Sequence, residues 1–412
     1  MEIQQKLETS LQYIYILSVA LSPLGPVFHY SLWGVCAVLI VWRALVDKAS
    51  LRVNLPPLGK NIFLLLTAFT LWSIFVSLLT FTGVQGWGRN ATVPLEMWLG
   101  MYLAARTLNS PESRGKFVKI FVAVSAIILL GNVLRAAQII SYFPNNSLRQ
   151  SNSIGALALL LFPTFSGYVL WSLRDSPFKK LLATTVVGVA LIISFSSGAW
   201  LGAASGGIVL LWYSLKYRKL HPLFCVVAAV MIVAVCAGVN VTTHGRFYKD
   251  FIREITQITS VDNIDRLTTG RNRIWRAAKH LISERPLTGQ GGSEFELKYI
   301  EVYKKYGKAL ALGNMDAVDH PHSTYLYLAY IGGLPALAIF LLAMLLALKK
   351  SITLANDERN VLFPWGVTIA MLIVVILVYG TNGDIFQGRR DISVMVWCIF
   401  GVLCVMKERN KS

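Results

Sequence analysis

A pair of arginines in a long polar stretch, 242–321, is the first feature that could do chemistry. Arg271 and Arg273 follow Gly270 at the predicted start of a helix. The positive end of a helix dipole disfavours basic side chains. Two of them there indicate an anionic ligand such as a phosphate, which the guanidinium groups and the dipole could hold together. A solvated basic face is the alternative interpretation.

A histidine stands where this polar stretch returns to apolar sequence. His322 follows Pro321, which suits the first turn of a new helix. Just inside that helix, near its positive end, the imidazole is expected to stay neutral near physiological pH and so to accept a proton as a general base. The alternative is a histidine of the membrane-interface belt. His320 precedes Pro321 and is expected to be a loop residue.

The elements that must position these residues are apolar and recur along the whole chain. Of its 412 residues, 55% are hydrophobic and 15% are charged, and the mean hydropathy is +0.56. Average proteins carry about 25% charged residues. The apolar runs predict an all-α membrane protein, residues 1–412, with about twelve transmembrane helices in a single polytopic domain. The predicted spans are 11–27, 29–46, 61–81, 93–107, 117–135, 153–173, 181–196, 199–215, 222–241, 322–348, 361–380 and 392–406.

The distribution of charge predicts the orientation in the membrane. A net charge of +18 would indicate nucleic acid in a soluble protein. Here the lysines and arginines gather in alternate connections between spans, so the positive-inside rule places those connections and both termini in the cytoplasm. No nucleic-acid partner is predicted.

Other chemistry-bearing motifs are missing from the sequence. The five cysteines fall in apolar segments without metal-like spacing. No metal cluster and no nucleotide motif is found, so neither a metal nor a cofactor is predicted. The energy for any reaction must then come from an activated substrate.

The stretch 242–321 is predicted to be a long outer loop between the ninth and tenth spans. Two short helices are predicted within it. One covers 271–284, with apolar residues at helical spacing and Pro286 limiting its end. The other covers 294–306, where Ser293 and Glu296 match a capping box. The loop is therefore expected to be a small ordered subdomain.

Three further arginines lie in short connections that are predicted to face the same outer side. They are Arg149, Arg389 and Arg390. Short outer loops normally avoid basic residues. With those of the long loop, these side chains would line an outward-facing basic site suited to a diphosphate at the membrane surface. Ordinary ion pairing, such as Asp391 with Arg390, is the alternative.

Three stretches of sequence occur in a fixed order around these residues. They are Ser197–Leu201, then Gly270–Trp275 continuing through Glu284–Gly291, then His322–Leu326 followed by Gly332 and Gly333. Together with the predicted spans and outer loop, they resemble the O-antigen ligase and polymerase superfamily of bacterial membrane glycosyltransferases. The chain departs from the family at Ser197, where an arginine is usual.

The resemblance implies a GT-C-like polytopic fold and a specific reaction. It implies that His322 acts as the base or a direct participant and that Arg271 binds the diphosphate, helped by Arg273 and the outer-loop arginines. The donor would be a polysaccharide on undecaprenyl diphosphate, and the acceptor a sugar hydroxyl of lipid A–core. Transfer would invert the configuration, without metal or cofactor, at the periplasmic face of the bacterial inner membrane.

Other functions stay open at this stage. The superfamily also includes O-antigen polymerases, which join lipid-linked repeats, and protein O-oligosaccharyltransferases, which often carry additional outer domains. A lipid-linked oligosaccharide flippase or another transporter is the alternative from a different class. A transporter should carry its charges within the spans, along a central cavity, whereas here they lie at span ends and in the outer loop.

Overall fold

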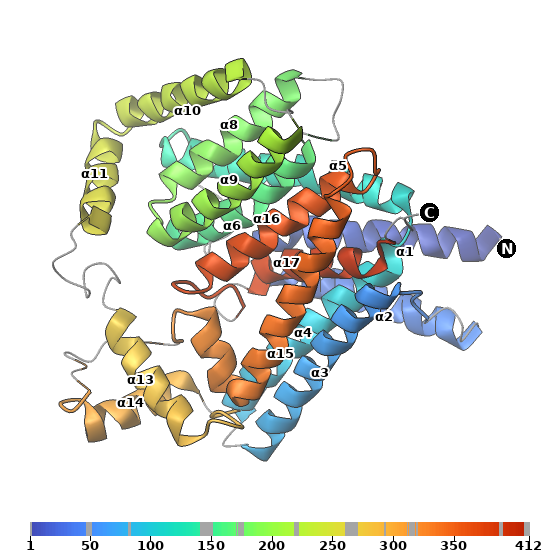
Figure 1. Cartoon of the computed structure of the whole chain (residues 1–412), viewed down its shortest axis with the longest axis vertical. Helices are drawn as coiled ribbons and strands as arrows, with labels where there is room; N and C mark the ends of the chain where they lie inside the picture. Colours follow the sequence, from blue (N-terminus) through green and yellow to red (C-terminus); the bar gives the residue numbers. More distant parts are fainter. Residues whose placement is uncertain are drawn as a thin grey trace.

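The fold is a bundle of helices, seen in a computed structural model (Figure 1). The structure describes residues 2–46, 52–80, 84–140, 151–169, 171, 177–217, 222–259, 271–291, 294–310, 312, 318, 320–386 and 390–407. All regular secondary structure in these ranges is helical. The predicted all-α class is therefore confirmed.

A helix lies at each position where a span is predicted. These helices are α1 (Glu2–Leu21), α2 (Pro26–Val46), α3 (Pro57–Leu79), α4 (Val84–Thr107), α5 (Pro111–Ala136), α6 (Ser151–Pro163) with the π-helix η4 (Thr164–Val169), α8 (Pro177–Ile193), α9 (Ser197–Tyr217), α10 (Pro222–Thr242), α15 (Thr324–Leu354), α16 (Phe363–Tyr379) and α17 (Arg390–Val405). Among the described residues, five helices are long and apolar enough to cross a membrane, namely α3, α5, α9, α10 and α15. Shorter apolar segments lie in α2, α6, α16 and α17. These findings support a membrane protein, and the number of spans stays a prediction.

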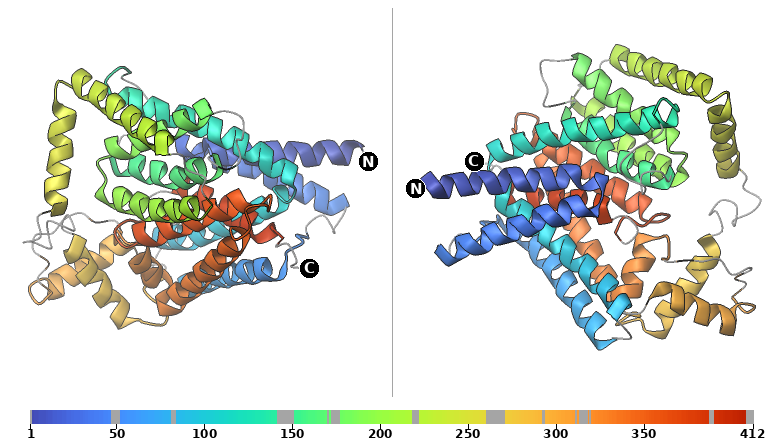
Figure 2. Two further views of the ribbon diagram at one scale, coloured as in Figure 1. Left: turned by 45° about the horizontal axis from the view of Figure 1, so that its top comes forward. Right: turned by 180° about the vertical axis from the view of Figure 1, so that it is seen from behind.

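The first two helices are separated by a break between Leu21 and Pro26. The short 3-10 helix η1 (Ser22–Leu24) follows α1, and Gly25 then adopts a φ of 141° before α2 begins at Pro26. Pro26 supplies no amide hydrogen, so a continuous helix would lose a hydrogen bond there. In the views of Figure 2, α1 and α2 extend side by side from the bundle.

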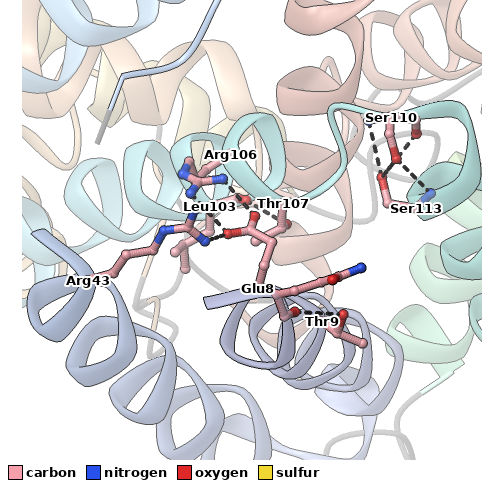
Figure 3. A network of polar contacts seen from close by, with 9 residues as sticks. Glu8, Thr9, Arg43, Leu103, Arg106, Thr107, Ser110 and Ser113 are labelled. Carbon is pink, nitrogen blue, oxygen red and sulfur yellow. Dashed lines mark hydrogen bonds and ion pairs between the residues drawn. The ribbon is translucent and has the colours of Figure 1, made fainter. Parts of the chain in front are cut away.

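One ion cluster ties the N-terminal helices together. Glu8 on α1 contacts Arg43 on α2 and Arg106 on α4 (Figure 3). Both carboxylate oxygens of Glu8 accept from Arg106, at 2.7 Å from Nη1 and 3.1 Å from Nη2. Such a two-pronged arrangement fixes geometry as well as charge.

The C-terminal helices form the centre of the bundle. Helix α17 packs against α4, α15 packs against α3 and α16, and α16 packs against α9. Phe386, in the connection between α16 and α17, lies with its ring against Phe340 of α15 and Trp397 of α17. All three side chains are buried. The connection after α16 is therefore anchored in the core.

Helix α15 is interrupted inside the bundle. Gly333 has φ 71° and ψ −174°, a backbone conformation that side chains disfavour. Pro335 follows, and its ring cannot continue the helical hydrogen bonds. The amide of Leu334 donates instead to the carbonyl of Pro286, at 2.8 Å. A Cβ on Gly333 would lie 2.3 Å from the Leu287 carbonyl oxygen, so only glycine permits this close approach.

Residues 286–290, from the middle of the predicted long loop, fill the interruption. The amide of Gln290 donates to the Tyr330 carbonyl, and Trp72 Nε1 of α3 donates to the Gly332 carbonyl, both at 2.7 Å. The buried Gln290 side chain in turn donates to the Leu281 carbonyl, at 2.8 Å. Backbone groups released by the break are thus paired, as buried polar groups must be. The break fixes the loop onto the bundle.

The segment between α10 and α15, predicted to be the long loop, contains three described helices rather than two. Helices α13 (Arg271–Glu284) and α14 (Phe295–Tyr306) confirm the two predictions. The capping-box residue Ser293 lies outside the described residues, and Glu294 precedes α14 without a side-chain cap. Helix α11 (Arg246–Thr259) was not predicted. Figure 1 shows α13 and α14 as a pair beside α15, and α10 and α11 as a corner at the edge of the bundle.

Candidate functional site

The segment that carries His322 lies just before α15 rather than inside it. The sequence predicted a helix from 322 with Pro321 in its first turn, but the first helical residue is Thr324 and Ser323 is its N-cap. That prediction was wrong by two residues. The reason is visible in the backbone, because His322 has a φ of 52°, in the left-handed region that a helix excludes. Non-glycine residues held there cost about 1–3 kcal/mol and cluster at functional sites.

A turn after α16 holds this strained segment in place. The amide of Thr324 donates to the carbonyls of Gly380 and Gly383, at 2.9 and 3.0 Å. The Thr324 hydroxyl donates to Gly383, and the Ser323 hydroxyl donates to Gly380, each at 3.1 Å. These bonds satisfy donors at the N-terminus of α15 that have no partner within the helix. Several hydrogen bonds to the turn 380–383 thereby fix the backbone beside His322.

His320 lies beside His322. The two ring centroids are 4.0 Å apart and the ring planes are tilted by 54°. Both side chains are half-buried. His320 is outside any helix, as predicted, but its ring belongs to the same site rather than to a separate surface loop.

Arg271 reaches the same turn from the long loop. It is the first residue of α13, and its Nη1 donates to the main-chain oxygen of Asn382 at 2.6 Å and to the side-chain Oδ1 at 2.7 Å. The last turn of a helix carries the negative end of the dipole, and the turn 380–383 directly follows the last turn of α16. The guanidinium therefore extends away from the positive end of its own helix toward the negative end of α16, which explains how an arginine is accommodated at this position.

The start of α9 borders the turn as well. A Cβ on Gly198 would lie 3.4 Å from the Tyr379 ring and 4.0 Å from Asn382 Nδ2. Ser197, which stands where the superfamily usually has an arginine, is the first residue of this helix. Three stretches far apart in sequence, at Gly198, Arg271 and Thr324, thus meet at residues 379–383.

The described residues do not bring the other predicted arginines together with Arg271. Arg273 is half-buried on α13, two residues from Arg271, and side chains at this spacing do not face each other on a helix. Arg149 and Arg389 lie outside the described residues. Arg390 begins α17, and its side chain is outside what the structure describes. Within the described residues, no group of three or more His, Cys, Asp or Glu side chains could hold a metal ion.

Asn382 is the site residue that sequence reasoning missed. The signal was local, since Asn382-Gly383 after an apolar helix is a typical turn sequence. The sequence could not indicate its partner, because Arg271 lies 111 residues earlier.

Part of the chain, including Arg271 and His322, matches a known protein family. Residues 182–341 match a family model described as O-Antigen ligase. This match supports membership of the chain in the O-antigen ligase superfamily. The superfamily covers ligases and polymerases that act on lipid-linked polysaccharides. No curated protein matches the chain. The O-antigen ligase match contains Gly198, Arg271 and His322, whereas Asn382 and the turn around it lie beyond its end.

Proposed function

We propose that this O-antigen ligase superfamily protein transfers O-antigen polysaccharide from undecaprenyl diphosphate to a sugar hydroxyl of lipid A–core. One observation carries the proposal. The turn 380–383 joins Arg271, which is suited to an anion, to the segment that holds His322, which is suited to proton transfer. Glycosyl transfer from a lipid diphosphate requires these two capacities at one place.

The proposed reaction is a single displacement. The acceptor oxygen forms a bond with the anomeric carbon while the bond from that carbon to the diphosphate oxygen breaks, so the configuration inverts. His322 takes the proton of the attacking hydroxyl. Arg271, with Arg273 as the nearest further guanidinium in sequence, stabilises the charge that develops on the leaving diphosphate. The donor is already activated, so no nucleotide or other cofactor is proposed.

The proposed orientation puts this site at the periplasmic face of the bacterial inner membrane. The site lies at the start of α9 and α15 and the end of α16. Their opposite ends meet where Tyr217 donates to the carbonyl of Asn356, at 2.9 Å, and these ends carry Lys216 on α9 and Lys349 on α15. In Figures 1 and 2, both chain termini lie on the side away from α11, α13 and α14. The positive-inside rule then supports cytoplasmic termini.

A transporter fits the described charges less well. The fully buried Lys350 is near the end of α15, and its Nζ donates to the Cys404 carbonyl at the end of α17, at 3.3 Å. A cation at a helix C-terminus is favourably placed against the dipole. Lys350 therefore has a structural explanation at the end of the bundle opposite the site, whereas transporter charges belong near the middle of the spans.

Polymerase activity within the superfamily is the second candidate, and one experiment separates the two. Lipopolysaccharide and the lipid-linked pool are compared on gels from cells that lack the protein, re-supplied with wild type, His322→Ala or His320→Ala. The proposal expects long polymer on undecaprenyl diphosphate with bare lipid A–core in the deficient cells, restored by wild type but not by His322→Ala. Lipopolysaccharide capped with a single repeat in the deficient cells would instead identify a polymerase. Unchanged profiles throughout would contradict both.

A further inference from the structure

Helix α10 presents an apolar surface at the edge of the bundle. Of its most apolar window, only 11% is buried inside the protein, the lowest share among the five long candidate spans. It packs mainly on α8, and large apolar side chains remain exposed along it, among them Leu223, Val226, Val230, Val233 and Val241. An exposed apolar helix of this length is typical of a surface that faces lipid.

A bonded corner leads from α10 into α11. His244 and Gly245 both adopt left-handed backbone, with φ of 51° and 78°. The side-chain oxygens of Asn240 and Thr243 accept the amides of Tyr248 and Phe247, at 2.9 and 3.3 Å. These bonds cap the first turn of α11. These hydrogen bonds therefore fix the direction in which α11 leaves α10. Figure 1 shows the two helices meeting in a sharp bend.

Helix α11 has one apolar and one charged side. Phe247, Tyr248, Phe251, Ile252 and Ile255 fall on one face at helical spacing. The opposite face holds Lys249, Asp250 and Arg253, of which the last two form an ion pair at 3.0 Å.

The protein covers only part of the apolar face. The ring centroid of Phe247 lies 5.5 Å from that of Phe195, and that of Phe251 lies 5.7 Å from that of Trp200. Trp200 belongs to the first turn of α9, which borders the site. These contacts put α11 on the same side of the bundle as the site.

The rest of the apolar face is exposed. Tyr248 is 60%, Ile252 42% and Ile255 37% exposed. These side chains begin at the end of the apolar surface of α10 and continue it around the corner. An exposed apolar stripe joined to a lipid-facing helix, with basic residues on its other side, is typical of a helix that lies in the membrane interface.

We infer that α11 lies in the membrane interface on the side of the site, with Tyr248, Ile252 and Ile255 in contact with lipid chains. Lys249 and Arg253 then face the headgroups and water. The occupant of the exposed stripe is the lipid that already surrounds α10. This inference does not depend on which reaction the protein catalyses.

Nitroxide labels on single cysteines test the inference in the full-length protein in phosphatidylethanolamine–phosphatidylglycerol vesicles. A background with Cys225→Ser and Cys236→Ser removes the cysteines that are not buried. Labels are placed at Ile252→Cys and Ile255→Cys, with Arg253→Cys on the charged face as the matched control. Accessibility to oxygen, which concentrates in lipid, is compared with accessibility to a water-soluble nickel chelate.

The expected result is an oxygen preference at 252 and 255 and a nickel preference at 253. Nickel access at 252 and 255 equal to that at 253 would show that α11 lies in water and overturn the inference. Exclusion of both reagents at 252 and 255 would also overturn it, because protein, such as a second copy of the chain, would then cover the stripe.

Discussion

A single nitrogen of Arg271 donates to two oxygens of Asn382, one from its main chain and one from its side chain. The side-chain bond makes Asn382 a positioning residue, because it fixes where the guanidinium points relative to the turn that also holds His322. Charge-assisted hydrogen bonds of this kind contribute about 1.5–3 kcal/mol.

Asn382→Ala should therefore lower the transfer rate about 10-fold or more, while Arg271→Ala should lower it further, since the alanine variant of Asn382 keeps the main-chain acceptor. Initial rates at saturating and limiting lipid-linked donor would measure this. Asn356→Ala, at the other end of the bundle, is the matched control and should transfer at the wild-type rate. Equal rates for Asn382→Ala and wild type would remove Asn382 from the site.

His322 offers a way to separate activity from folding. Its left-handed backbone suits glycine better than histidine. His322→Gly should abolish transfer, since a general base contributes about 10²–10⁴-fold, and yet unfold at a temperature no lower than wild type. Thermal unfolding in detergent and a transfer assay on the same preparation would check both parts. Substantial activity in a stable His322→Gly protein would exclude the proposed role of the imidazole.

The break in α15 should be intolerant of any side chain. Gly333→Ala places a Cβ against the Leu287 carbonyl and imposes a positive φ on alanine. We therefore expect the free energy of unfolding to fall by about 2 kcal/mol or more. Gly238→Ala in α10 is the control, because a Cβ there meets nothing within 4 Å. The two variants are compared by unfolding temperature and by protease cleavage within 286–291. A Gly333→Ala protein as stable and as resistant as Gly238→Ala would mean that the loop is not fixed by this break.

The Glu8 cluster should stabilise the protein without affecting the site. Its side chains are only 10–26% exposed, and Glu8→Ala leaves two guanidinium groups beside one another without their carboxylate. We expect the free energy of unfolding to fall by about 1–3 kcal/mol. Activity per folded molecule should be unchanged.

The exposed pair of Glu112 and Lys116 provides the comparison for the Glu8 cluster. Glu112→Ala should leave the free energy of unfolding nearly unchanged, since exposed ion pairs on a helix surface contribute little. Equal effects of the Glu8 and Glu112 substitutions on unfolding would show that the cluster has no special structural role.

Much of the fold follows from local sequence. Apolar length predicts the positions of the main helices, and periodicity with Pro286 predicts α13. Helix α11 was missed because it is a short amphipathic element inside a stretch dominated by polar residues. The first residue of α15 was predicted wrongly because the left-handed conformation of His322 depends on the turn 380–383, which is distant in sequence.

The site was predictable only in part. Arg271 and His322 could be selected because their residue types are unusual beside predicted helix starts. Asn382 could not be selected, because an asparagine before a glycine is already accounted for by a turn and indicates no further role. Its contact with Arg271 spans 111 positions and arises only when α9, α13, α15 and α16 are assembled.

Reconstituted transfer with purified components tests whether the protein joins polysaccharide to lipid A–core through His322. Purified protein in lipid nanodiscs receives labelled polysaccharide on undecaprenyl diphosphate together with lipid A–core, and the products are separated on a gel. Movement of the label to lipid A–core with wild type, and its loss with His322→Ala, is the predicted result. Label that stays on undecaprenyl diphosphate in longer chains, or equal transfer by His322→Ala, would contradict the account.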